Sequence, residues 1–104
     1  MPRFPGTPGP DYLKGGPLND YINGFGGNDT ISGRYGDDRL VGAQGDDSIL
    51  GEYGDDFLNG GVGSDRLFGD EGADTLKGGY GNDLVRGGDG ADLMDGGNAN
   101  DHMY

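Results

Sequence analysis

Aspartate recurs through this chain at a fixed interval of nine residues, without insertion or deletion. The members of the series are Asp11, Asp20, Asp29, Asp38, Asp47, Asp56, Asp65, Asp74, Asp83, Asp92 and Asp101. Carboxylates suit hard divalent cations, which take about six to eight oxygen ligands. The chemistry that this series favours is therefore cation binding, provided that the fold brings successive aspartates together.

The same interval defines a nine-residue repeat with three further columns. Glycine opens every repeat from Gly6 to Gly96, and glycine also takes position four except at Leu18 and Ala99. Position eight is always apolar, and we expect this whole column to be buried: Leu13, Ile22, Ile31, Leu40, Ile49, Leu58, Leu67, Leu76, Val85, Met94 and Met103. The repeats fill residues 6–104 and leave residues 1–5 as an N-terminal lead-in outside the frame.

Each repeat must contain a loop and a short strand. Its first six residues are rich in Gly, Asp and Asn, which predicts a loop because glycine tolerates positive φ and close backbone approach. The remaining three, such as residues 39–41, predict a strand with the central side chain inward and its neighbours outward. A glycine every nine residues would break a helix. The pattern predicts an all-β repeat protein.

Composition narrows the range of partners. The 104 residues include 26 glycines, are 31% apolar and carry a net charge of −12. Such a composition alone favours disorder, but a disordered tract has no reason to keep its columns in phase. The acidic charge disfavours nucleic acid and anionic membrane surfaces, and the chain has no cysteine. It also lacks an apolar run long enough for a membrane span. Divalent cations remain the natural partner.

The repeat resembles a known family motif, G-G-x-G-x-D-x-U-x, in which U is a large apolar residue. Residues 60–68 (GGVGSDRLF) and 78–86 (GGYGNDLVR) fit it without a mismatch. The chain therefore resembles the RTX (repeats-in-toxin) calcium-binding modules of secreted bacterial proteins, known as hemolysin-type repeats. The resemblance implies a right-handed parallel β-roll with two strands per turn, in which repeat i stacks on repeat i+2. It also implies export by a type I system and an extracellular location.

The resemblance further implies how calcium is held. Each ion would lie between two stacked loops, one offering the carbonyls of positions two and four, the next those of positions one and three, and both an aspartate. In the centre of the chain the ligands would be Arg34 O, Gly36 O and Asp38 with Gly51 O, Tyr53 O and Asp56. The implied carbonyl donors include Gly27, Gly36, Gly45, Gly54, Gly63, Gly72 and Gly81 at position four, and Gly42, Gly51, Gly60, Gly69, Gly78 and Gly87 at position one.

The number of sites follows from the spacing. Aspartates eighteen residues apart form nine possible pairs, from Asp11–Asp29 to Asp83–Asp101. Leu18 and Ala99 should weaken their loops because a Cβ at position four obstructs the turn, which leaves about seven good sites. The apolar column is too small to fold the chain by itself, so metal binding must supply folding energy. We expect a metal-free chain that is disordered and folds cooperatively at about 10⁻⁴–10⁻³ M Ca²⁺.

Other interpretations of the same residues remain open. Adjacent acids such as Asp37-Asp38 resemble the carboxylate pairs of glycosidases, but they recur as loop chemistry, and His102 falls at an outward position. We therefore predict no enzymatic activity. Tyr35 and Tyr53 occupy the same position in adjacent turns, as a stiffening ladder or as a contact for a partner. The chain is either a module of a larger secreted protein or a complete small subunit that stacks end to end into a calcium-dependent extracellular filament or surface layer.

Overall fold

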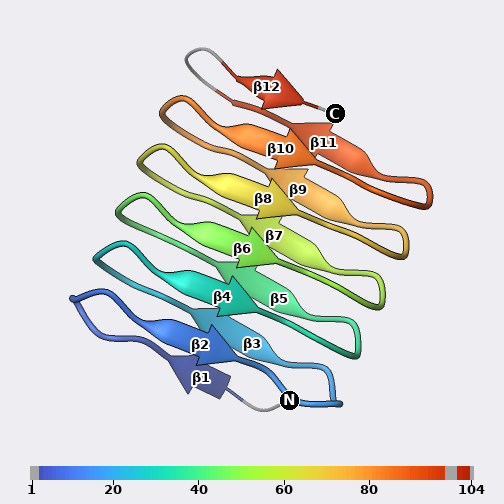
Figure 1. The fold of residues 1–104 in the computed structure, drawn as a ribbon, viewed down its shortest axis with the longest axis horizontal. Coiled ribbons are helices and arrows are strands. Elements are labelled where there is room, and N and C mark those ends of the chain that lie inside the picture. Colours follow the sequence, from blue (N-terminus) through green and yellow to red (C-terminus); the bar gives the residue numbers. More distant parts are fainter. Residues whose placement is uncertain (1–2, 98–100, 104) are drawn as a thin grey trace.

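A computed structural model describes residues 3–97 and 101–103 of the chain. The described part is built from short strands and loops and contains no helix (Figure 1). It therefore has no helix that is long and apolar enough to cross a membrane. The strands are β1 (Arg3–Pro5), β2 (Tyr12–Lys14), β3 (Tyr21–Asn23), β4 (Thr30–Ser32), β5 (Arg39–Val41), β6 (Ser48–Leu50), β7 (Phe57–Asn59), β8 (Arg66–Phe68), β9 (Thr75–Lys77), β10 (Leu84–Arg86), β11 (Leu93–Asp95) and β12 (His102–Met103).

The strands form two parallel sheets that face each other across a thin core. One sheet, the odd sheet, has the order β1-β3-β5-β7-β9-β11, and the other, the even sheet, has the order β12-β10-β8-β6-β4-β2. Paired residues are eighteen apart, as Ile31 with Ile49 and Leu40 with Leu58. The chain thus winds as a β-solenoid with two repeats per turn, which confirms the predicted parallel β-roll.

The position-eight column makes the core, as predicted, but not over its full length. Eight of its members are 0% exposed: Ile22, Ile31, Leu40, Ile49, Leu58, Leu67, Leu76 and Val85. Leu13 and Met94 are only partly buried against this cluster, and Met103 is 51% exposed. The prediction that the whole column is buried is therefore wrong at both ends. A residue in this column is covered by the turns before and after it, and the outermost ones have a neighbour on one side only.

The strand frame begins earlier than the repeat count predicts. Residues of the lead-in, Arg3–Pro5, form β1 and pair in register with Tyr21–Asn23 of β3. Phe4 stands nine residues before Leu13 and so continues the position-eight column. The backbone of the lead-in thereby supplies the odd sheet with its first strand.

Candidate calcium sites

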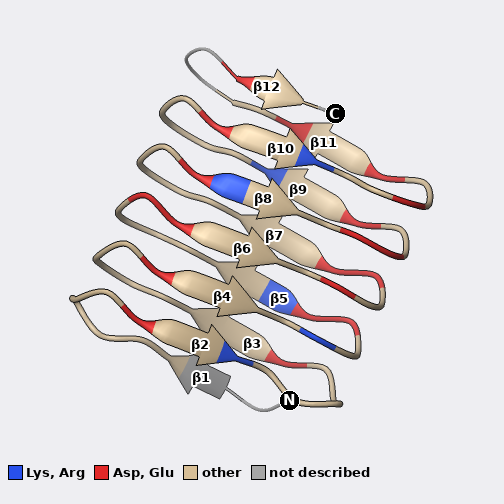
Figure 2. Cartoon of the chain, viewed as in Figure 1, with Lys and Arg blue, Asp and Glu red and all other residues tan. Residues whose placement is uncertain are grey.

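The loops form two stacked edges, one on each side of the roll. We call the loops that lead into even-numbered strands the even edge and those that lead into odd-numbered strands the odd edge. Acidic residues gather along both edges, whereas most lysines and arginines lie on the strands or immediately after them (Figure 2). The structure therefore concentrates negative charge where the aspartate series enters each strand.

Glycine at position four is required by the backbone. Gly54 has a φ of 102°, and a Cβ built on it would overlap the carbonyl oxygen of Gly36 in the preceding turn. Position two is also left-handed, which the sequence did not predict. Its φ is 69° at Arg34 and 68° at Glu52 although neither is glycine. Two left-handed residues per loop produce the tight curl that stacks one loop on the next.

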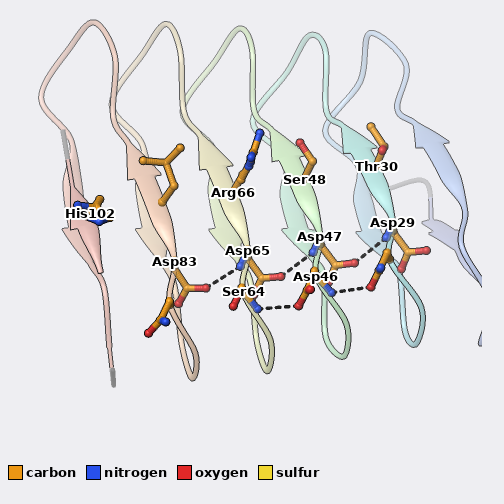
Figure 3. Close-up of a pocket in the computed structure, with 13 residues that line it drawn as sticks. Asp29, Thr30, Asp46, Asp47, Ser48, Ser64, Asp65, Arg66, Asp83 and His102 are labelled. Carbon is orange, nitrogen blue, oxygen red and sulfur yellow. Dashed lines mark hydrogen bonds between the residues drawn. The ribbon is translucent and has the colours of Figure 1, made fainter. Parts of the chain in front are cut away.

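The aspartates of position six form a continuous ladder along each edge. The backbone amide of Asp38 donates to Asp56 Oδ1 one turn later at 2.8 Å, and Asp47 donates to Asp65 Oδ1 at the same distance (Figure 3). All nine pairs predicted from the spacing are joined in this way, at 2.7 to 2.9 Å. The structure thus brings together every aspartate of the series with its neighbour eighteen residues away.

One oxygen of each carboxylate from Asp20 to Asp83 is buried and has no partner. The aspartates from Asp20 to Asp83 are only 1 to 3% exposed. The oxygens that lack a hydrogen bond are Asp20 Oδ1 and the Oδ2 atoms of Asp29, Asp38, Asp47, Asp56, Asp65, Asp74 and Asp83. A buried ionised carboxylate is strongly unfavourable unless it is paired or coordinates a metal. These oxygens therefore need a cationic partner or a proton.

From Asp29 to Asp83, the unpaired oxygen lies against the glycine at position one of its own loop. A Cβ built on Gly33 would lie 2.6 Å from Asp38 Oδ2 and 3.1 Å from Gly51 O of the next turn. A Cβ on Gly51 would lie 2.6 Å from Asp56 Oδ2 and 3.0 Å from Gly69 O. A carboxylate oxygen and a carbonyl oxygen from successive turns thus converge on one small space. Carboxylate and carbonyl oxygens are the hard ligands that calcium takes, and here they come from successive turns.

The other carbonyls of the expected ligand set have different surroundings. Arg34 O accepts a hydrogen bond from the Tyr53 amide at 2.9 Å, and Ala43 O accepts one from Val62 at 2.8 Å. Each position-two carbonyl in these rungs keeps a second lone pair for a metal. Within the described residues no group of three or more acidic, histidine or cysteine side chains forms a metal cluster. Backbone carbonyls would therefore have to complete any site, and the full ligand set stays a prediction.

Crowding of the carboxylates shifts their titration. Burial, followed by the charge of the neighbouring aspartate one turn away, raises the pKa of Asp56 and Asp65 to about 8. The same two causes raise the pKa of Asp38 to about 7 and that of Asp47 to about 6. Hydrogen bonds from backbone amides act in the opposite direction. Without a cation, the folded roll therefore favours protonated carboxyl groups along both edges.

The first two loops differ from the rest. Neither Thr7 nor Gly16, at position two, has a positive φ, because each precedes a proline (Pro8 and Pro17), which favours extended conformations. The position-two amides then point to the aspartates of their own loops, and Thr7 N donates to Asp11 Oδ2 at 2.6 Å. Gly16 N similarly donates to Asp20 Oδ2 at 2.8 Å.

The two loops that lack glycine at position four are only partly visible. Leu18 is 62% exposed, and its φ is not positive, so it does not adopt the conformation that glycine has in the central loops. Ala99 lies outside the described residues. The predicted weakening of both loops as calcium sites remains a prediction.

Outward residues near the sites behave as surface features. Tyr35 and Tyr53 stack with ring centroids 5.0 Å apart and an interplanar angle of 6°, as expected for a ladder.

An open groove of about 830 Å³ follows the even edge beside β4, β6, β8 and β10, and His102 is exposed at its end (Figure 3). The groove is lined mainly by loop residues of positions five and six and by the first residues of the strands, so it belongs to the stacked loops.

Comparison with known proteins gives the class of the chain. The family model described as RTX calcium-binding nonapeptide repeat (4 copies) matches residues 5–34, 32–67 and 68–103. The chain therefore belongs to the RTX calcium-binding repeat family, and its β-solenoid is a calcium-binding RTX module. Searches of curated proteins and of solved structures gave no significant match.

Proposed function

We propose that this module binds calcium between successive turns and that binding drives its folding. The observation that carries the proposal is the row of buried carboxylate oxygens without partners, which from Asp38 to Asp83 each lie near a carbonyl of the next turn. About seven ions, each shared by two loops, would contribute a charge of about +14 against the net −12 of the chain. Neutralising both edges removes the repulsion that opposes compaction.

The proposal extends to where the module works. RTX repeats are typical of secreted bacterial proteins, and a chain that needs calcium to fold would stay unfolded where calcium is scarce. We place its folding outside the cell, after export by a type I system, as a structural and secretion-associated part of a larger protein. In this role the module has no catalytic residue, and its ions are structural.

Circular dichroism during titration with Ca²⁺ and with EGTA tests the proposal. We expect a disordered spectrum without metal and a cooperative gain of β signal at about 10⁻⁴–10⁻³ M Ca²⁺. Mg²⁺ should not replace Ca²⁺, because it requires near-ideal octahedral geometry and sheds water reluctantly. A metal-free protein at neutral pH with a full β spectrum would contradict the proposal.

End-to-end stacking of copies is the second candidate. The outermost strands of each sheet are paired on one side only within this chain, and Met103 of the core column is 51% exposed. A further turn would cover it, whether that turn came from the same polypeptide or from a second copy. Light scattering with and without Ca²⁺ separates the two, since only assembly gives large particles that require calcium.

A further inference from the structure

Position five carries a second ladder that runs beside the aspartate ladder. The side-chain Oδ1 of an Asp or Asn at position five accepts a hydrogen bond from the backbone amide of position five one turn later. Asp55 N donates to Asp37 Oδ1, and Asp37 N donates to Asn19 Oδ1, both at 2.8 Å. The same bond joins Asp46 N to Asn28 and Ser64 N to Asp46 at 2.8 Å. Each side chain therefore leans from its own loop towards the next turn, beside the gap that two aspartates of position six share.

Asparagine and aspartate make this contact with the same geometry, so along the ladder they differ only in charge. In chain order the residues beside the nine gaps are Pro10, Asn19, Asn28, Asp37, Asp46, Asp55, Ser64, Ala73 and Asn82. The three charged ones are consecutive. They flank the pairs Asp38–Asp56, Asp47–Asp65 and Asp56–Asp74, whereas the gaps on either side have neutral neighbours.

The charge at position five reaches both members of a pair. Asp37 adjoins Asp38 in the chain, and its Oδ1 accepts the amide of Asp55, the residue before Asp56. Asp46 likewise adjoins Asp47, and its Oδ1 accepts the amide of Ser64, the residue before Asp65. A divalent ion placed in such a gap would feel an additional carboxylate at position five, where the other gaps have a neutral residue. Through partly screened solvent, this charge would strengthen binding about three- to tenfold.

We propose that Asp37, Asp46 and Asp55 set the order in which the roll holds its calcium ions. The three central gaps bind calcium most tightly and release it last, and the gaps towards both ends release it first. This inference rests on the proposed calcium function and adds a hierarchy within it. The position-five acids are positioning residues for charge, and the direct contacts to the ion belong to the loops themselves.

Stepwise removal of calcium from the loaded protein tests the hierarchy. Native mass spectrometry at rising EGTA concentration counts the ions that remain, and ¹⁵N NMR of the position-six amides reports which turns have lost theirs. We expect a plateau at three ions, with the amides of Asp38, Asp47 and Asp56 changing last. Release of all ions in a single step, or in order from one end, would overturn the inference.

Isosteric variants separate charge from hydrogen bonding. The triple variant D37N/D46N/D55N keeps every Oδ1 acceptor, and we expect it to lose the plateau, with central retention weakened about three- to tenfold. The reverse variant Asn28→Asp adds a charge beside the pair Asp29–Asp47 and should extend the plateau to four ions. Asp46→Ala removes both the acceptor and the charge and serves as the structural comparison.

The possible results separate a failure of the proposed hierarchy from a failure of calcium binding itself. If Asp46→Ala shortens the plateau and Asp46→Asn does not, the ladder acts through its hydrogen bond and the proposed role of charge is wrong. If calcium binds and drives folding but all gaps release it evenly, the hierarchy fails and the calcium function stands. If no ion binds at all, both fail together.

Discussion

The central loops and the first two loops all have an aspartate at position six, but its carboxylate has different hydrogen-bond partners in the two regions. In the centre, as at Asp56, one oxygen accepts an amide from the neighbouring turn and the other is buried without a partner. In the first two loops Oδ2 accepts an amide inside the loop, from Thr7 for Asp11 and from Gly16 for Asp20, although Asp20 Oδ1 has no hydrogen-bond partner. A proline at position three makes the difference, because it keeps position two out of the left-handed conformation.

This difference shows that an aspartate repeated at position six of every loop does not define a metal site by itself. The backbone amide of position two can satisfy the Oδ2 atom of the aspartate in place of a cation, and the direction of this amide depends on a neighbouring proline that carries no charge. We therefore expect the first loops to depend less on calcium than the central ones. Four changes test this contrast, in order of decreasing effect.

The largest effect should come from a central aspartate. Asp56 belongs to two pairs, with Asp38 and with Asp74, so Asp56→Asn should raise the calcium concentration at half-folding by about tenfold or more, since even outer partners of a metal site are worth that much. The matched variant Asp11→Asn changes an aspartate that has one pair and its own amide donor. It should shift the midpoint much less. Equal shifts in calcium-titrated circular dichroism would remove the contrast.

The next largest difference in stability between the two regions should come from replacing the glycine of position four with alanine. Gly54→Ala forces alanine to a φ of 102° and against Gly36 O, which we expect to cost about 2–4 kcal/mol. Gly9→Ala occupies the same column, but its Cβ would have only Thr7 Oγ1 nearby, at 3.9 Å, and should be nearly neutral. Denaturation by urea in saturating calcium measures both. A stable Gly54→Ala variant would show that the loop can relax.

Acid should partly replace calcium in the central turns. Folding raises the pKa of Asp56 and Asp65 from the ordinary 3.8 to about 8, so the folded state binds more protons than the unfolded one. The resulting stabilisation is fully present below about pH 4 and is lost as the pH rises through about 8. We expect the metal-free chain to be more compact at pH 4 than at pH 8, by small-angle scattering in EGTA. No change in radius over this range would contradict the raised values.

The smallest effect should come from repairing the second loop. Leu18→Gly alone should change little, because Pro17 still restricts Gly16. The double variant Pro17→Val/Leu18→Gly restores the central pattern and should lower the calcium midpoint by less than about threefold, the order of magnitude expected for one loop among many. Native mass spectrometry should then count one more bound ion. If the single variant achieves the same gain, proline is not the cause.

Several features of the site can be predicted from the sequence. Others depend on residues that are visible in the sequence but lie outside the glycine, aspartate and apolar columns. The obligatory glycine of position four and the pairing of aspartates eighteen residues apart follow from spacing, since Ile31 and Ile49 of adjacent turns fix the register. Prolines at position three and asparagine or aspartate at position five are visible in the sequence. Left-handed φ at position two is not, because the residues that adopt it, such as Phe25, Arg34 and Ala43, differ in size, charge and polarity.

The sequence by itself determined the alternation of loop and strand, the identity of the core column and the interval at which carboxylates return. These are local properties of a nine-residue pattern, and each repeat carries them independently. Only the tertiary structure decided which atoms meet each carboxylate, because the amide that reaches Asp56 Oδ1 comes from Asp38 and the carbonyl beside its Oδ2 comes from Gly69. A donor in another turn is fixed by the stacking of the whole roll, and so the need for a cation appears only when the turns are assembled.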